Sequence, residues 1–182
     1  MTSTRLVGLG SMGAGMGRNL LRHGFALTVD DLDADRVAAL VADGAVAASP
    51  GPVEEAVVML SLPAPQHVAA VCLGDDGLLA RMRPGSALVN LSTVNLEMAR
   101  ALDAACAERG VLCVDAPVTG AADGAADGTL TIMCGATDEA LAAAHPQLEA
   151  VSQSIYHLGA CPAGTASKLL TNMLWFRSEE HT

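Results

Sequence analysis

The sequence is poor in aromatic residues, since Phe, Tyr and Trp together make up 2% of its 182 residues. A chain with so few rings must fill its core with Ala, Val, Leu and Met, which suits helices packed closely on a parallel sheet. Basic residues are also scarce, and the formal net charge is −10. Because nucleic acids and anionic membranes attract basic surfaces, we expect neither of them as a partner.

Long apolar runs and an N-terminal targeting signal are both missing. No apolar run reaches the roughly 18 residues that a membrane-spanning helix needs, and no basic segment followed by an apolar stretch opens the chain. The cysteines contain no CxxC pair and fall mostly inside apolar runs, which predicts buried free thiols in a reducing compartment (Cys72, Cys106, Cys113, Cys134 and Cys161). We therefore expect a cytoplasmic protein without a metal site.

A glycine-rich turn near the N-terminus carries the strongest local pattern. Gly8, Gly10 and Gly13 have GxGxxG spacing between an apolar strand (residues 5–7) and an amphipathic helix (residues 14–21). In a dinucleotide-binding βαβ unit the first glycine permits the tight turn, the second lets the backbone approach a pyrophosphate, and the third lets helix and strand pack closely. The N–H groups at the helix start then face the phosphates. A plain glycine-rich loop is the alternative.

Two adjacent carboxylates follow at the distance that such a unit requires. Residues 25–30 have the pattern of a second strand that ends in Asp30 and Asp31, about 20 residues beyond the last glycine, where a Rossmann domain binds the ribose hydroxyls. Periodicity does not choose between the two. The next residue is Leu32 rather than an arginine that would meet a 2′-phosphate, so the sequence favours NAD over NADP. Alternatively, these acids only solvate the strand end and cap the next helix.

The rest of the chain alternates between strand and helix patterns. Strands are predicted at residues 45–47, 56–62, 86–91, 111–114, 129–133 and 154–158, and helices at 33–41, 68–73, 95–109 and 138–151. Ser49-Pro50 predicts one more helix start, leading to Glu54-Glu55 in its first turn. This alternation predicts an α/β fold with a doubly wound, mostly parallel sheet of the Rossmann type.

Four motifs in one order give a more specific signal. They are GLGSMGAGMGRNL from Gly8, LSTV from Leu91, DAPVTGAADGAADGTLTIM from Asp115, and GTASKLLTNML from Gly164. Together they resemble the β-hydroxyacid dehydrogenase family, which includes 3-hydroxyisobutyrate dehydrogenase, over essentially residues 4–174. The last two motifs are more specific than the glycine turn, because Rossmann domains in general lack them.

The resemblance assigns roles to individual residues. It implies that one set of residues binds the cofactor, with Asp31 at the ribose position (Gly8, Leu9, Gly10, Ser11, Met12, Gly13, Asp31, Leu62, Pro63 and Thr93). His67 follows the Pro63 loop and is a further candidate for cofactor contact, although an exposed histidine at a helix start is an equal interpretation. Thr119 and Gly120 match the pair that holds a substrate carboxylate.

Lys168 matches the catalytic lysine of the family, and Asn172 matches the residue that orients the substrate. Hydride transfer from an alcohol requires a base for the hydroxyl proton, and a lysine with a lowered pKa can serve as base and acid. Lys168 is the only lysine, and a surface lysine with a solvated amine is the alternative. The family usually has Ser-Gly-Gly where this chain has Thr119, Gly120 and Ala121, which changes the carboxylate site and puts the substrate in doubt.

The resemblance also predicts the domain organisation. Residues 1–160 form the dinucleotide-binding domain, and 161–176 begin a long helix that leads, in the family, to an all-helical domain missing here. Residues 177–182 fit no amphipathic continuation and resemble a translated sequencing-library adapter, with a natural polar tail as the alternative. Leu169, Leu170 and Met173 would then be exposed. We expect the full-length parent to form a homo-oligomer, and this chain to bind NAD with little or no turnover.

The predicted function is therefore hydride transfer between the nicotinamide of NAD and a small β-hydroxyacid, as in 3-hydroxyisobutyrate dehydrogenase. Alternatives within the same chemistry are reductases of tartronate semialdehyde, glyoxylate or succinate semialdehyde, and sugar-acid dehydrogenases of the threonate type. A non-catalytic NAD-binding fragment is the alternative from another class. The sequence does not choose among them.

Overall fold

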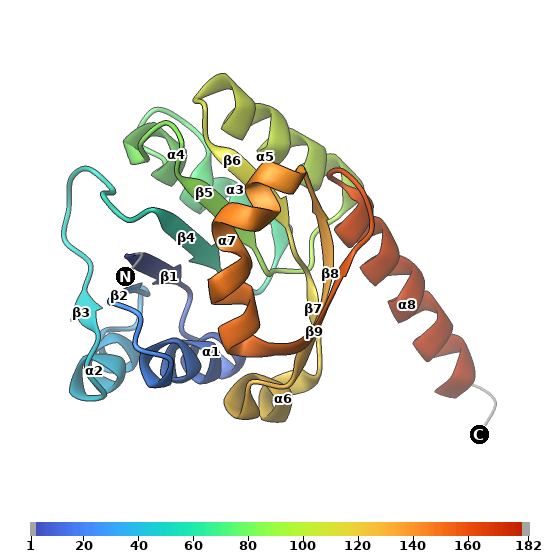
Figure 1. Cartoon of the computed structure of the whole chain (residues 1–182), viewed down its shortest axis with the longest axis horizontal. Coiled ribbons are helices and arrows are strands. Elements are labelled where there is room, and N and C mark those ends of the chain that lie inside the picture. Colours follow the sequence, from blue (N-terminus) through green and yellow to red (C-terminus); the bar gives the residue numbers. More distant parts are fainter. Residues whose placement is uncertain (1–2, 180–182) are drawn as a thin grey trace.

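The computed structural model describes residues 3–179, with side chains through Leu174 (Figure 1). One sheet forms its centre, in the strand order β3-β2-β1-β4-β5-β6-β8-β7, with β9 paired to β8. The strands are β1 (Thr4–Val7), β2 (Leu27–Asp30), β3 (Val46–Ala47), β4 (Val57–Leu60), β5 (Ala87–Asn90), β6 (Leu112–Asp115), β7 (Val118–Thr119), β8 (Leu130–Ala136) and β9 (Ser152–His157).

Strands β1 to β6 are all parallel, and their order 3-2-1-4-5-6 is that of a Rossmann sheet. The predicted doubly wound, mostly parallel α/β fold is thus confirmed. The second part departs from it, because β8 pairs antiparallel with both β6 and β7. β6 and β7 pair with successive parts of β8 in one antiparallel register, so they continue one another along β8 across Ala116 and Pro117.

Helices cover both faces of the sheet (Figure 1). They are α1 (Ser11–Arg22), α2 (Ala34–Ala42), α3 (Pro65–Cys72), α4 (Leu78–Arg81), α5 (Leu96–Glu108), α6 (Ala121–Asp127), α7 (Asp138–Val151) and α8 (Ala163–Glu179). Buried residues of α1, α2 and α7 pack on one face of the sheet, and those of α3, α4 and α5 pack on the other. Successive residues of β4 alternate between these two cores, as the period of a strand requires.

The helix predicted to start at Ser49-Pro50 is wrong. Residues 48–56 are irregular apart from an isolated bridge between Val53 and Met82. Gly51 has a φ of +122°, and Pro52 follows it without a backbone donor. The residue before a proline is disfavoured in the helical region, so the second proline overrides the start signal of the first.

Helix α8 continues through Glu179, so its backbone remains helical into the first part of the tail predicted at residues 177–182. The last three residues of that predicted tail lie outside the described residues. On the described part of α8, the exposed fractions of Leu170 and Met173 are 62% and 65%, as predicted for its apolar face. Leu169 is half-buried instead. Among residues 3–179, no helix is both long and apolar enough to cross a membrane.

A buried ion pair joins the central sheet to the segment that precedes β4. Arg5 occupies β1, between β2 and β4, and its guanidinium donates to both carboxylate oxygens of Glu55 at 3.2 and 3.3 Å. Burial raises the pKa of Glu55, but the hydrogen bond from Thr28 and the Arg5 charge outweigh it, and the net pKa lies below 4.5. Glu55 therefore contributes stability as a carboxylate above about pH 4.5, and this contribution is lost as the pH falls through its folded pKa.

We predict that Arg5→Leu lowers the free energy of unfolding by about 3–5 kcal/mol, because it leaves the buried Glu55 carboxylate unpaired. The double variant Arg5→Leu/Glu55→Leu should recover most of this loss and should lack the part of the acid sensitivity that Glu55 causes. Urea denaturation between about pH 2.5 and pH 8 measures both effects, since the range must extend below the lowered pKa of Glu55. Equal losses in the single and double variants would show that packing of Arg5, rather than its charge, stabilises the sheet.

Candidate functional site

The turn between β1 and α1 is held by glycines that leave no room for side chains. A Cβ on Gly8, whose φ is +91°, would collide with the carbonyl oxygen of Ser61, and one on Gly13 would collide with the carbonyl oxygen of Gly8. A Cβ on Gly10 would meet only the Arg36 guanidinium, at 3.8 Å. The first and third glycines thus allow close packing, and the second faces open space, as the dinucleotide-binding pattern requires.

The first turn of α1 presents free backbone donors at this turn. Gly10 is the N-cap residue, and no side chain caps the helix. The first intrahelical bond runs from the N–H of Ala14 to the carbonyl of Gly10, which leaves the N–H groups of Ser11, Met12 and Gly13 without a helical partner. Uncapped N–H groups and the positive end of the helix dipole fit a pyrophosphate.

Asp31 is the carboxylate that faces the glycine turn. Its Oδ2 accepts the N–H of Leu9 at 2.6 Å, and its Oδ1 accepts the N–H of Asp33 at 2.9 Å. Asp33 is the N-cap residue of α2, and it accepts the N–H of Asp35. Asp33 is therefore the residue that caps α2, and the Asp31 carboxylate is held beside the glycine turn. This position fits the ribose hydroxyls of the cofactor.

Sequence reasoning missed a cation at the same place. The guanidinium of Arg36 lies 4.0 Å from Asp31 Oδ2 and 3.1 Å from Asp33 Oδ2. Arg36 lies in the first turn of α2, five residues beyond Asp31. In the sequence only Leu32, the residue directly after the acidic pair, was considered, and this arginine was therefore missed. Its acidic neighbours neutralise much of its charge.

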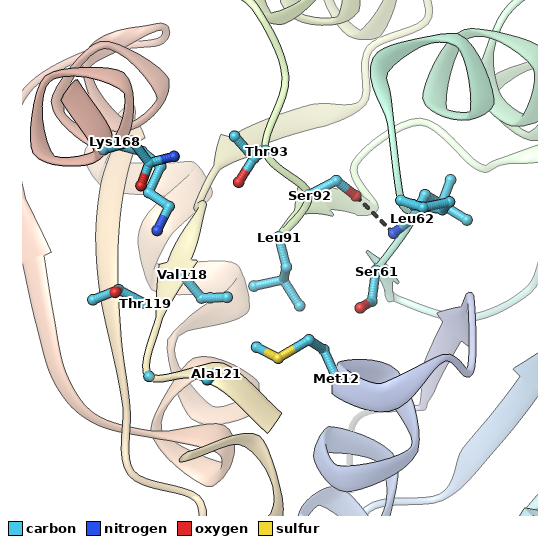
Figure 2. Close-up of a pocket in the computed structure, with 13 residues that line it drawn as sticks. Met12, Ser61, Leu62, Leu91, Ser92, Thr93, Val118, Thr119, Ala121 and Lys168 are labelled. Carbon is cyan, nitrogen blue, oxygen red and sulfur yellow. Dashed lines mark hydrogen bonds between the residues drawn. The ribbon is translucent and has the colours of Figure 1, made fainter. Parts of the chain in front are cut away.

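A pocket of about 330 Å³ opens beside the glycine turn at the carboxyl ends of β4 and β5 (Figure 2). It brings together residues of all four motifs, from segments far apart in the sequence. Its lining comprises Met12, Ser61, Leu62, Pro63, Leu91, Ser92, Thr93, Val118, Thr119, Gly120, Ala121, Lys168 and Asn172. Ligands of open α/β sheets bind at this edge.

Eight residues predicted for cofactor, substrate or catalysis line this pocket: Met12, Leu62, Pro63, Thr93, Thr119, Gly120, Lys168 and Asn172. The other glycine-turn residues are not among the lining, and Asp31 contacts this turn through the N–H of Leu9. His67 does not line the pocket: this residue lies in the first turn of α3 and is exposed. His67 comes shortly after the β4 loop in the sequence, but it is not one of the residues that line the pocket.

Ser92 is a pocket residue that sequence reasoning missed. Its hydroxyl accepts the N–H of Leu62 at 2.8 Å, shown as a dashed line in Figure 2, and its backbone N–H donates to Asn90 Oδ1 at 3.2 Å. Ser92 therefore ties the loop after β5 to the loop after β4. The available signal was its place directly after a buried strand, next to Thr93.

The Lys168 side chain extends from α8 into the pocket toward Thr119 (Figure 2). Burial lowers the pKa of Lys168 below 10.5, because desolvation disfavours the ammonium form. Thr119 ends β7, and Gly120 follows with a φ of +131°. Ala121 has a φ of +54°, which is unusual for a residue with a side chain. The resembled family has glycine at this position. Alanine has a Cβ, so its backbone is strained at this positive φ, whereas a glycine would not be.

A buried carboxylate anchors the helix that carries Lys168. Asp115, at the end of β6, accepts the Thr165 hydroxyl at 2.6 Å and the Thr165 N–H at 2.7 Å. Burial raises the pKa of Asp115, although the two bonds from Thr165 act against this rise. A Cβ on Gly164 would collide with the Asp115 and Met133 carbonyl oxygens, so α8 begins in direct contact with the sheet.

We predict that Thr165→Val lowers the free energy of unfolding by about 1–3 kcal/mol, because it leaves one oxygen of a buried carboxylate without its donor. Thr171→Val is the matched control on the same helix, since Thr171 is exposed and donates within the helix and toward Met133. The control should change stability by less than about 0.5 kcal/mol. Chemical denaturation measures both, and similar losses would contradict a specific anchor at Thr165.

Comparison with known proteins agrees with this geometry. Residues 4–159 match the family model described as the NAD binding domain of 6-phosphogluconate dehydrogenase. The chain is 46% identical over 177 residues to the NAD-dependent L-serine dehydrogenase of Pseudomonas aeruginosa, and 42% identical to the 3-hydroxyisobutyrate dehydrogenase of the same organism. In both matches the aligned region covers 96% of this chain and 59% of the relative.

Among solved structures, the 3-hydroxyisobutyrate dehydrogenase of Mycobacterium tuberculosis with L-serine superposes with a TM-score of 0.90 at 34% identity, over 96% of this chain and 60% of that one. The fold and the glycine turn thus define a dinucleotide-binding domain of the Rossmann class. More specifically, the chain belongs to the family of NAD-binding domains typified by that of 6-phosphogluconate dehydrogenase. It spans about 59% of the length of the curated relatives named above.

Proposed function

We propose that the chain provides the cofactor site and the catalytic lysine of an NAD-dependent dehydrogenase that oxidises small β-hydroxyacids. The observation that carries the proposal is the shared pocket of Lys168, Asn172, Thr119 and Met12, which joins an amine with a lowered pKa to the first turn of α1. The names of the relatives, which specify L-serine and 3-hydroxyisobutyrate, support a small acid with a hydroxyl group on its β-carbon.

In this proposal Lys168 is the general acid and base. In its neutral form the amine takes the proton from the substrate hydroxyl, and the resulting ammonium returns a proton in the reverse direction. NAD, when bound, supplies the acceptor for the hydride that leaves the hydroxyl-bearing carbon of the substrate. Thr119 and the backbone of Gly120 bind the substrate carboxylate, and Asn172, one helical turn beyond Lys168, orients the substrate beside the amine.

The cofactor is held by the residues at the opposite side of the pocket. The N–H groups of the first turn of α1 bind the pyrophosphate, and Asp31 accepts hydrogen bonds from the ribose hydroxyls. Leu62, Pro63 and Thr93 line the pocket, and the family resemblance supports a position for them along the path toward the nicotinamide. We also propose that the protein acts in the cytoplasm, since its five cysteines are free thiols, and that the complete enzyme forms a homo-oligomer.

We predict that Asp31→Ala weakens NAD binding about 10- to 100-fold, because a charged acceptor for the ribose hydroxyls contributes about 1.5–3 kcal/mol. NADP binding should weaken less, since the variant removes a carboxylate that repels the 2′-phosphate. Asp35→Ala is the control for charge, because Asp35 is exposed on α2. Calorimetric titration of the 182-residue chain measures the affinities, and unchanged NAD binding in Asp31→Ala would contradict the assigned ribose contact.

We predict that Lys168→Ala lowers the turnover rate at least about 100-fold, while the NAD affinity changes less than about twofold. The assay uses a chimera in which this chain replaces the matched part of the Pseudomonas aeruginosa L-serine dehydrogenase, and NADH formation is followed with L-serine and 3-hydroxyisobutyrate. The chain alone should bind NAD with little or no turnover. Loss of NAD binding together with turnover in Lys168→Ala would indicate a structural lysine and would overturn the proposed role.

The same assay tests the alternative substrates. Reduction rates with tartronate semialdehyde, glyoxylate and succinate semialdehyde, and oxidation rates with four-carbon sugar acids, would be compared with the rate for L-serine. The strained Ala121 beside Thr119 lies at the carboxylate end of the pocket, so a difference from the relatives should be found in the Michaelis constant for the acid. An inactive chimera that binds NAD and contains an intact Lys168 would favour a non-catalytic NAD-binding module.

A further inference from the structure

A second cluster of polar side chains lies apart from the lining of the cofactor and substrate pocket. A carboxylate oxygen of Asp103 and the sulfur atoms of Cys113 and Cys161 all lie within 4.8 Å of one another. They come from three segments: α5 carries Asp103, β6 carries Cys113, and Cys161 lies in the turn that precedes α8. The proposed dehydrogenase chemistry uses none of the three.

The cluster borders a cavity of its own. This cavity has a volume of about 190 Å³, and all three residues line it together with small or apolar residues and one threonine (Ala107, Val111, Leu112, Ala136, Thr137 and Ala160). Such a volume accommodates a metal ion and several water molecules, since one water occupies about 30 Å³ in the liquid. Cys161 is half-buried, so the cluster is not sealed inside the core.

The spacing fits tetrahedral coordination after a small contraction. In a zinc site with metal–sulfur bonds of about 2.3 Å, neighbouring ligand atoms lie about 3.8 Å apart. The three ligand atoms, all within 4.8 Å, therefore need to approach by no more than about 1 Å. The Cys161 thiol now points at the carbonyl oxygen of Ala99, with a sulfur–oxygen distance of 3.6 Å, and a rotation of its side chain would release it.

The donor set determines which ion would bind. Two thiolates with one carboxylate favour thiophilic divalent cations, whereas Mg²⁺ and Ca²⁺ prefer oxygen ligands alone. Three protein ligands with water in the fourth position make an open tetrahedral site.

We propose that Asp103, Cys113 and Cys161 bind a divalent cation of the Zn²⁺ class, with a water molecule from the adjoining cavity as the fourth ligand. Each thiol releases one proton when the cation binds, and no electron is transferred. The bound ion links α5 and β6 to the turn before α8. Because α8 carries Lys168, the ion also fixes the start of the helix that forms one wall of the pocket.

The test uses Cd²⁺ as a spectroscopic probe on the 182-residue chain, kept reduced with a phosphine. Titration should produce a thiolate-to-cadmium charge-transfer band in the ultraviolet that saturates near one Cd²⁺ per chain, and Zn²⁺ should remove the band by competition. Cys113→Ala and Cys161→Ala should each weaken binding at least about 100-fold, and Asp103→Asn about 10-fold. Cys134→Ala is the matched control, because Cys134 is buried in the core on the other face of the sheet.

A second readout does not depend on the band. Zn²⁺ at about 100 times its dissociation constant should raise the melting temperature of the unaltered chain by roughly 5–10 °C, and of Cys134→Ala equally, but not of Cys161→Ala. Absence of a band, or an equal band in Cys161→Ala, would overturn the proposal. The proposal would also be overturned if the mass of the chain fell by two hydrogens in air and the reduced chain showed no band. Cys113 and Cys161 would then be a disulfide pair rather than metal ligands.

Discussion

The close approach of the Gly13 backbone to the Gly8 carbonyl is the constraint on which the cofactor side of the structure depends. Because neither residue has a side chain, α1 begins directly above the end of β1, and the carbonyl of Ser61 in the next strand's loop packs against the same turn. Because of this contact, the free N–H groups in the first turn of α1 lie at the edge of the sheet. A single methyl group at either glycine would separate the helix from the strand and displace its N–H groups.

The substrate side depends on a different contact, between β6 and α8. Asp115 holds the Thr165 backbone and hydroxyl, and Gly164 allows the helix to touch the sheet. Together they fix the direction in which α8 leaves, and Lys168 follows Thr165 by three residues. The proposed metal ligand Cys161 lies just before the same helix, so one short segment, residues 161–168, connects the two sites.

Much of this was readable in the sequence, and the failures have identifiable causes. The glycine spacing and the two C-terminal motifs contain most of the predicted residues that share the pocket, because these residues lie at the carboxyl end of a strand or on α8. The acid at the end of the second strand contacts the glycine turn instead. The helix at Ser49-Pro50 was wrong, since a second proline cancels the start signal. The prediction of free thiols is confirmed, and four of the five cysteines are buried. The meeting of Cys113 and Cys161 with Asp103 could not be predicted, because the three lie on separate segments and leave no CxxC spacing.

By itself the sequence determined the alternation of strands and helices, the glycine turn and the identity of the one lysine, because these follow from local periodicity and residue type. Periodicity left Asp30 and Asp31 open, the family resemblance favoured Asp31, and the structure places Asp31 against the turn. Only the tertiary structure decided that Arg36 lies beside Asp31 and that Arg5 pairs with Glu55. It also placed Asp115 under Thr165 and Cys161 beside Cys113. These contacts join residues from separate elements, and their distances are set by how helices pack on the sheet, which no local pattern encodes.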